Sequence, residues 1–380
     1  MTVEQVSGIL NELATEQLGE GVVSTVNYDN MVDVGRTLAD AMGVDNYVNK
    51  ISDKIGKSIV SIRKYEGVAP SIFRDKWDYG NILEEIILDM PTAVDNSTWK
   101  LEDNHDYSAE EHTFVRPGAS VKYYNNKTTY RLRTASIAKR QVMDSMKSPE
   151  TMVGFFSGIQ MAYENQKAVF NEALVMSTIN NMIGETLADN NANRVVKVLT
   201  MYNAATGLAL TANKALTDPE FIRYANRLLN LYAVRMKKLS VLYNIQGVPR
   251  HTPKEFLHTI LHQEYVSSAQ SYLYSDTFNR DDVTLSLGTI ETVPYWQGSG
   301  TDYAWASTSK IDVTTASGQT VAQGNILGIM FDDKACAVCN TDTYESASFT
   351  ASANFTNYFY FVDESHLNNL SQNFVVFLLA

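Results

Sequence analysis

Phe374-Val-Val-Phe-Leu-Leu-Ala380, a run of seven apolar residues, is the stretch that decides the fold. Two further runs rich in apolar residues precede it, Ile326-Leu-Gly-Ile-Met-Phe331 and Asn357-Tyr-Phe-Tyr-Phe-Val362. Such runs aggregate when they are exposed to water, so we expect each of them to be paired in a sheet. Three strands within the last 55 residues predict a core that the C-terminal segment completes.

Upstream of these strands, a long helix is predicted over residues 149–188. Ser148 is expected at the N-cap, Pro149 at the first helical position and Glu150 at the positive end of the helix dipole. Forty helical residues span about 60 Å, which exceeds what one compact domain requires. Three glycines each weaken the helix by about 1 kcal/mol relative to alanine, so one continuous helix and a kinked pair both remain open. These glycines are Gly154, Gly158 and Gly184.

Two shorter helices have explicit start signals. Asp218-Pro-Glu opens a helix over 219–240, and Thr252-Pro-Lys-Glu255 has the form of a capping box that opens a helix over 253–263. Between the long helix and this pair, residues 194–200 are predicted to form a strand. Helical spacing places four residues of the 219–240 helix inward, namely Phe221, Leu228, Leu231 and Tyr232.

Residues 64–126 differ in character from the helical region. Trp77 to Leu88 is predicted to be an extended strand, and residues 127–134 alternate polar and apolar side chains as a half-buried return strand does. Between them, residues 95–112 contain six acidic residues and one lysine. This stretch has little apolar surface to offset the entropy lost on ordering, so we expect a protruding loop.

The remaining segments give coarser predictions. Residues 1–30 are expected to form a mobile arm with one short helix, and residues 31–42 show helical spacing. Residues 58–62 and 283–296 are predicted to form strands. The Gly-, Ser- and Thr-rich residues 297–325 predict an exposed loop or an edge hairpin.

The composition disfavours several classes of protein. With 31 Lys and Arg against 43 Asp and Glu, the formal net charge is −12, and specific nucleic-acid binding, which requires excess cations, is not expected. No window approaches the roughly 18 uncharged apolar residues of a membrane span, and no secretory signal is visible. Cys336 and Cys339 have no second Cys or His pair nearby, so we interpret them as structural residues in a reducing compartment.

The strongest catalytic candidate is the pair His258 and His262. Residues four apart on a helix share a face and can bind zinc, but Thr259 stands where a zinc protease has its glutamate base. A third ligand is also missing, so two helix-surface histidines are the favoured interpretation. Arg235-Met-Lys-Lys238 is interpreted as a solvated helix face rather than a phosphate-binding patch. We find no Walker loop, dinucleotide fingerprint or nucleophile elbow, and we expect no metal, cofactor or catalytic residue.

In their order, these segments resemble the major capsid protein of tailed bacteriophages, whose fold is named for the Hong Kong 97 phage. Gly80-Asn-Ile-Leu-Glu-Glu-Ile86 with the acidic stretch resembles the extended loop of short-tailed phages. Ile326 to Val338 resembles a strand with an aspartate turn, and Asn357 through Phe377 resembles the closing strands. The resemblance implies an α+β fold of the Hong Kong 97 type, with an extended β-hairpin loop and a long spine helix. The implied parts are an N-terminal arm (1–63), the extended loop (64–126), a peripheral domain with the spine helix (127–191), an axial domain (192–325) and the closing strands of the peripheral domain (326–380).

The resemblance further implies a structural protein, not an enzyme, that self-assembles into an icosahedral shell around a double-stranded DNA genome. The implied partners are copies of itself in pentamers and hexamers, a separate scaffolding protein, a portal protein and DNA enclosed without sequence-specific binding. The implied location is the virion capsid, with assembly in the host cytoplasm. Two alternatives remain, another virion component such as a tail or adhesion protein, and a metal-dependent hydrolase based on His258 and His262. Contacts between copies are expected on the extended loop, at Trp77, Ile82, Glu84, Glu85, Trp99, Glu102 and Asp103.

Overall fold

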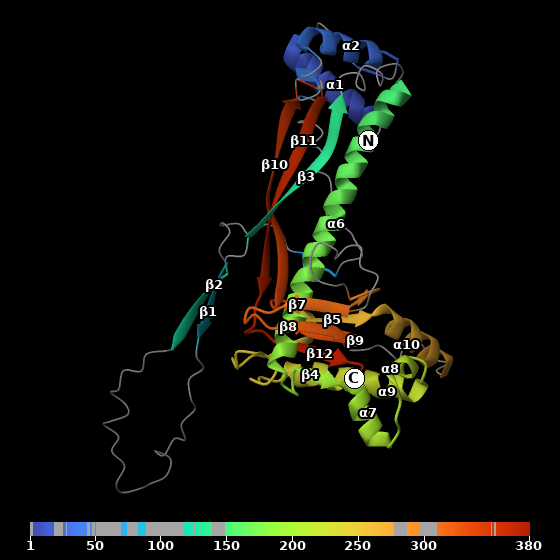
Figure 1. Cartoon of the computed structure of the whole chain (residues 1–380), viewed down its shortest axis with the longest axis vertical. Helices are drawn as coiled ribbons and strands as arrows, with labels where there is room; N and C mark the ends of the chain where they lie inside the picture. Colours follow the sequence, from blue (N-terminus) through green and yellow to red (C-terminus); the bar gives the residue numbers. More distant parts are fainter. Residues whose placement is uncertain are drawn as a thin grey trace, which may run out of the picture.

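The computed structural model describes residues 3–18, 26–27, 29–43, 46–47, 50, 70–73, 83–88, 118–124, 127–138, 149–276, 287–296, 310–350, 352 and 355–380. Figure 1 shows an elongated molecule in which one long helix, α6 (Pro149–Asp189), runs alongside two separate sheets. This helix is continuous over 41 residues, which decides between the two arrangements that the sequence left open. Its predicted start at Pro149 is confirmed, whereas Ser148 lies outside the described residues.

The lower sheet in Figure 1 has five strands in the order β4-β12-β9-β5-β6. The C-terminal strand β12 pairs in parallel with β4 and antiparallel with β9, so it lies inside the sheet rather than at an edge. Every residue of β9 and β12 is buried, which confirms the predicted pairing of the two apolar runs. The strands are β4 (Val195–Lys197), β5 (Leu257–His262), β6 (Thr289–Val293), β9 (Ile326–Asp332) and β12 (Phe374–Leu378).

Strand β12 contributes to two cores because successive side chains point to opposite faces of the sheet. Val375 and Phe377 pack among helices α7 (Val198–Thr206), α9 (Pro219–Lys237) and α10 (Gln263–Asp276). On the opposite face, Val376 packs with the C-terminal half of α6 and with the hairpin of β7 (Lys310–Thr314) and β8 (Thr320–Gly324). A one-turn helix, α8 (Ala212–Ala215), precedes α9. The sheet is therefore covered on both faces by its own chain.

The upper sheet has three antiparallel strands in the order β10-β11-β3 and follows the other half of α6 (Figure 1). Its strands are β3 (Lys127–Ala138), β10 (Cys336–Thr350) and β11 (Phe355–Asn368). At the far end, α1 (Val3–Leu18) contacts α2 (Met31–Met42), with Leu13 and Leu38 fully buried. The helix expected within residues 1–30 and the helical spacing from Met31 are thus confirmed.

The helix predicted over 253–263 is wrong. A short 3-10 turn, η2 (Lys254–Phe256), leads directly into strand β5. The Thr252 hydroxyl does not cap a helix but donates to Asp332 Oδ2 at 2.9 Å. Residues 257–261 are buried on both faces of the sheet, and this burial outweighs the local capping pattern.

Two smaller predictions are corrected in the same region. The strand predicted over 194–200 covers only Val195–Lys197, because α7 begins at Val198. On α9 the Asp218 cap is confirmed, since its Oδ1 accepts a hydrogen bond from the Phe221 amide at 2.9 Å. Leu231, however, is 41% exposed and lies on the outer face of α9 rather than in the core.

The return strand of the extended loop also differs from the prediction. Residues 127–138 form a strand, but β3 pairs with β11 in the three-stranded sheet. The partner of β1 (Leu83–Leu88) is instead β2 (Ala119–Tyr124), which ends shortly before β3 begins. Residues 310–324 form the hairpin β7–β8, but it is a separate two-stranded sheet with Ile311 and Val313 buried rather than an exposed loop or an edge hairpin. The predicted strand at 58–62 and the acidic stretch 95–112 lie outside the described residues.

Candidate assembly interface

Strands β1 and β2 form a two-stranded hairpin that belongs to neither large sheet and projects away from α6 (Figure 1). The register runs from Leu83 opposite Tyr124 to Leu88 opposite Ala119. Exposure alternates along β1, so Glu85 and Ile87 face the rest of the chain while their neighbours face outward. The hairpin therefore has an attached face and an outward face.

The outward face exposes mainly apolar side chains. Ile86 and Leu88 are 61% and 67% exposed, and the register places Val121 directly opposite Ile86. Tyr123, opposite Glu84, is 67% exposed. Cross-strand neighbours lie about 5 Å apart, so these side chains form one surface. Contiguous exposed apolar surface of this kind is typical of a site of protein contact.

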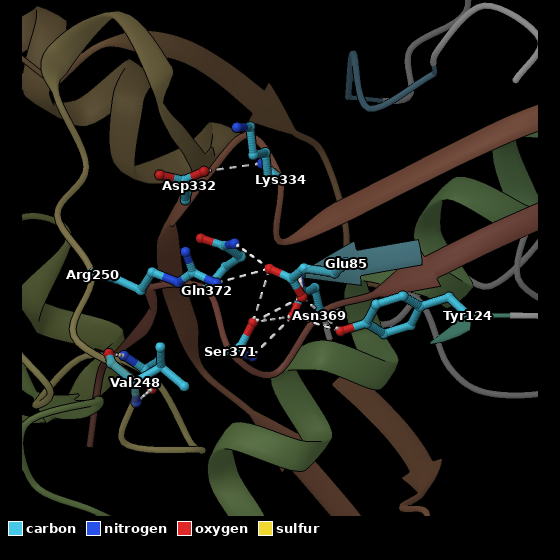
Figure 2. Close-up of polar contacts among 10 residues, drawn as sticks. Glu85, Tyr124, Val248, Arg250, Asp332, Lys334, Asn369, Ser371 and Gln372 are labelled. Atoms are coloured by element: carbon cyan, nitrogen blue, oxygen red, sulfur yellow. Dashed lines mark hydrogen bonds and ion pairs between the residues drawn. The ribbon is translucent and has the colours of Figure 1, made fainter. Parts of the chain in front are cut away.

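The attached face is held by a polar network centred on Glu85, which Figure 2 shows. The Glu85 side chain is only 17% exposed, and the Arg250 guanidinium forms an ion pair with it at 2.9 Å. Donors from five residues point at the two carboxylate oxygens. They are Arg250 Nη2 (2.9 Å), Gln372 Nε2 (3.0 Å), Asn369 Nδ2 (2.8 Å), the Tyr124 hydroxyl (3.1 Å) and the Ser371 hydroxyl (3.2 Å).

Three of these donors come from the short turn that joins β11 to β12. Within that turn the Ser371 amide donates to Asn369 Oδ1 at 3.0 Å, and the Asn369 amide donates to the Ala335 carbonyl at 2.8 Å. The Leu370 carbonyl accepts from the Ile245 amide at 3.2 Å. The hairpin is thus fixed at the junction between the two large sheets.

The network gives the Glu85 carboxylate both hydrogen-bond donors and a positively charged partner. Hydrogen bonds to a charged acceptor are roughly twice as strong as neutral ones, and Arg250 supplies the compensating charge. Burial raises the pKa of Tyr124, and the adjacent Glu85 carboxylate raises it further, so the tyrosine stays protonated as a donor. The attachment therefore centres on the Glu85 carboxylate of β1, and the Tyr124 hydroxyl of β2 adds a hydrogen bond to Asn369 Oδ1 at 2.9 Å.

A second attachment fixes residues 70–73 to both large sheets, through Glu291 of β6 and Val338 of β10. The Ser71 amide donates to Glu291 Oε2 at 2.9 Å, and His258 Nε2 lies 2.7 Å from the same carboxylate oxygen. Phe73 forms a parallel bridge with Val338. Burial opposes ionisation of Glu291, but the hydrogen bonds from His258 and Ser71 outweigh it and lower the pKa of Glu291. His258 is consequently part of a structural contact.

The helix placement of His258 and His262, on which both the favoured surface interpretation and the zinc alternative rested, is wrong. Both residues lie on β5 rather than on a helix, and four strand residues separate them by about 13 Å. One ion cannot bridge that distance. Within the described residues, no three His, Cys, Asp or Glu side chains are close enough together to bind a metal ion.

Of the predicted contact residues, the structure describes only Glu84 and Glu85. Glu84 is exposed on the outward face, whereas Glu85 is held inside its own chain. Trp77, Ile82, Trp99, Glu102 and Asp103 lie outside the described residues.

Sequence reasoning missed the exposed Ile86, Leu88, Val121 and Tyr123 and the whole polar network around Glu85. The available signal for the outward face was that alternate side chains of a strand point to opposite sides, which places Ile86 and Leu88 on the same face of β1. The network has no local signal, since Glu85 and Asn369 are 284 residues apart.

Among the described helices, none combines the length and apolar character needed to cross a bilayer. Cys336 and Cys339 are buried on β10 and are not joined in a disulfide, and burial raises the pKa of Cys336. This is consistent with the structural role predicted for both.

Comparisons with known proteins agree with this architecture. The family described as Phi29-like phage major capsid protein matches residues 9–378. In the capsid structure of Staphylococcus phage Andhra, a chain with 9% identity has a TM-score of 0.53 over 84% of this chain and 86% of that one. In a structure of the head fibre and inner core protein of native bacteriophage P68, a chain with 10% identity has a TM-score of 0.51 over 81% of this chain and 83% of that one. No curated protein sequence matches. These likenesses confirm the α+β fold of the Hong Kong 97 type expected from the sequence.

Proposed function

Because this chain belongs to the family of Phi29-like phage major capsid proteins, we propose that its copies form a closed icosahedral shell through the outward face of the β1–β2 hairpin. Membership of the family implies a structural role in the phage virion, not an enzymatic one. The hairpin face is the feature that a neighbouring copy would cover.

The observation that carries this proposal is the contrast between the two faces of the hairpin. The attached face has five donors on one carboxylate, so the hairpin is held in position before any neighbour arrives. The outward face exposes Ile86, Leu88, Val121 and Tyr123. A positioned apolar surface loses little conformational entropy when a partner binds it, which favours association.

Around this contact we propose the arrangement expected from the sequence. The N-terminal arm is 1–63, the extended loop 64–126, the peripheral domain with the spine helix 127–191 and the axial domain 192–325. The closing segment 326–380 contributes β10 and β11 to one sheet and β9 and β12 to the other. Copies would group into pentamers and hexamers, and the expected contacts at Trp77, Ile82, Glu84, Trp99, Glu102 and Asp103 remain part of this proposal.

The further partners follow from the same role. We propose that assembly takes place in the host cytoplasm around a separate scaffolding protein, and that a portal protein occupies one vertex. The net charge of −12 supports a container that encloses DNA without binding it tightly. A denaturing gel and mass spectrometry of purified particles would identify each of these components.

The proposal is tested by placing charge on the outward face. The double variant Ile86→Asp and Leu88→Asp should remain folded, because both side chains are already in water, but should form few or no shells. Leu208→Asp is the matched control, since Leu208 is 53% exposed in the loop after α7. Sedimentation and electron microscopy report shells directly. Normal shells from the double variant would overturn the proposed contact.

A further inference from the structure

One segment of the chain has a charge opposite to that of the rest. Residues 221–254 contain seven Lys and Arg and no Asp or Glu. The whole chain has 31 Lys and Arg against 43 Asp and Glu, so the other residues have 24 against 43 and a formal charge of −19. The segment comprises most of α9 and the loop that follows it, and all of it is described.

The cations of α9 lie on its outward face. The inward face is formed by residues such as Phe221, Tyr232 and Met236, which are buried against the five-stranded sheet. The outward face has an apolar centre, because Leu231 and Val234 are 41% and 69% exposed. The exposed cations around it are Arg223, Arg227, Arg235, Lys237 and Lys238.

Two of these guanidinium groups are held in place by aromatic rings. Arg227 Cζ lies 5.1 Å from the centre of the Tyr224 ring, and Arg235 Cζ lies 5.5 Å from the centre of the Tyr232 ring. With respect to the described part of the chain, Arg227, Arg235, Lys237 and Lys238 form no ion pair. Described carboxylates therefore do not pair with these four cations, and the aromatic rings position two of them, Arg227 and Arg235.

The apolar surface continues beyond the helix. Leu239, Val241 and Leu242 follow α9 directly, and each is 46% exposed. Five large apolar side chains thus accompany the cations over residues 231–242. A surface with an apolar centre and an arginine-containing rim has the composition of a protein–protein interface.

We propose that this outward face of α9 and the loop after it, residues 223–242, bind an acidic surface of a neighbouring copy of this chain. This inference rests on the proposed shell and adds a second contact, distinct from the β1–β2 hairpin. Nucleic acid would match the cations but would leave the apolar centre exposed, since its backbone offers phosphate and sugar. Another copy offers apolar surface as well as acidic side chains, since its residues outside 221–254 have a formal charge of −19.

Position in the molecule supports a contact between copies rather than within one. Figure 1 places α9 at the end of the molecule opposite to α1 and α2. Residues 1–49 carry eight Asp and Glu against one Arg, but the 41-residue α6 lies between the two ends and separates them by about 60 Å. The acidic helices of the same copy therefore cannot neutralise α9.

The test uses zero-length carbodiimide crosslinking of empty shells assembled from a mixture of ¹⁴N- and ¹⁵N-labelled chains. Carbodiimide joins an amine to a carboxylate that it touches, so Lys237 or Lys238 should be joined to Asp or Glu in peptides of mixed isotope composition. Both lysines should also be acetylated severalfold more slowly in shells than in unassembled chains. Lys214 of α8, which is exposed, is the internal control and should react equally in both.

A pair of variants separates charge from folding. Val234→Asp places a carboxylate at the centre of the basic face and should lower the yield of shells or make them dissociate at lower denaturant. Val234→Lys keeps the sign of the surface and should be affected less. Circular dichroism should be unchanged in both, since Val234 is already 69% exposed.

The outcomes distinguish this inference from the proposed function. Shells in which Lys237 and Lys238 react as they do in unassembled chains would overturn the α9 contact and leave the shell itself intact. Protection that arises only in DNA-filled particles, or crosslinks only to a different protein, would also overturn it. A failure of the unaltered chain to form shells under any condition would instead contradict the proposed function.

Discussion

The five-stranded sheet and the β1–β2 hairpin use the same secondary structure for opposite purposes. In the sheet, every residue of β9 and β12 is buried by elements of the same chain. In the hairpin, one face is attached through the polar network around Glu85 and the other exposes four large apolar side chains. The difference teaches that the chain buries both faces of the sheet itself but leaves one face of the hairpin exposed, which is the face that the proposed shell contact would cover.

The largest effect should come from removing a side chain that the sheet buries. Phe377→Ala should lower the free energy of unfolding by about 3–5 kcal/mol, because Phe377 is fully buried and packs edge-on against Tyr232. Tyr123→Ala on the hairpin is the counterpart and should change stability by about 0.5 kcal/mol or less. Urea unfolding of unassembled chains measures both. If the two variants lost the same free energy of unfolding, the distinction between the two regions would be contradicted.

A second prediction tests how closely the sheet is packed. Gly288, which precedes β6, has φ +75°, and a Cβ atom there would lie 2.1 Å from the Leu257 carbonyl oxygen. Gly288→Ala should therefore cost about 2–4 kcal/mol from the backbone conformation and the clash together. Gly207 has φ +72° and no neighbour within 4 Å of an added Cβ atom, so a substitution there measures the cost of the backbone conformation without the clash. Gly207→Ala should cost about 1 kcal/mol, and a similar loss at both positions would show that the close approach is unimportant.

On the hairpin side, the expected effect is smaller and local. Glu85→Gln keeps the shape of the side chain but leaves Arg250 without its charge partner, and should weaken the attachment by about 1–3 kcal/mol. Hydrogen exchange of the β2 amides should accelerate accordingly, while that of β9 stays unchanged. Glu84→Gln, on the outward face, is the matched control. Unaltered exchange in Glu85→Gln would mean that the network does not hold the hairpin.

The smallest effect concerns pH and the attachment of residues 70–73. The pKa of Glu291 is lowered in the folded chain, so the folded carboxyl binds a proton less readily than an exposed glutamate does. Its contribution to stability is present above the ordinary glutamate pKa and is lost as the pH falls through the lowered value. On acidification, the thermal stability of the unaltered chain should therefore fall more than that of the Glu291→Gln variant. Parallel pH profiles for the two proteins would contradict this assignment.

Local patterns in the sequence predicted the elements whose signals are themselves local. The long helix begins at Pro149 as predicted, and the Asp218 side chain caps α9 through the Phe221 amide, a group only three residues away. The capping box at Thr252 failed because the same hydroxyl found Asp332, 80 residues away, and because β5 is buried on both faces. Burial of this kind is decided by tertiary neighbours that a capping pattern does not contain.

The candidate interface was predictable only in outline. The resemblance pointed to the extended loop, and the contacts predicted there were acidic residues, tryptophans and Ile82. The alternation of β1 would have identified Ile86 and Leu88, but the network that orients them joins Glu85 to Arg250 and Ser371 across more than 160 residues. Gly184 shows a similar limit, since it was interpreted as a bend in α6 but instead allows the close approach of Val313 on β7.

Hydrogen exchange of the same amides in shells and in unassembled chains tests the central claim most directly. If a neighbouring copy covers the outward face, the amides of β1 and β2 should become much more protected on assembly, while those of β9 and β12 keep the protection they already have. Equal exchange of the hairpin in the two states, with intact shells confirmed by electron microscopy, would contradict the account.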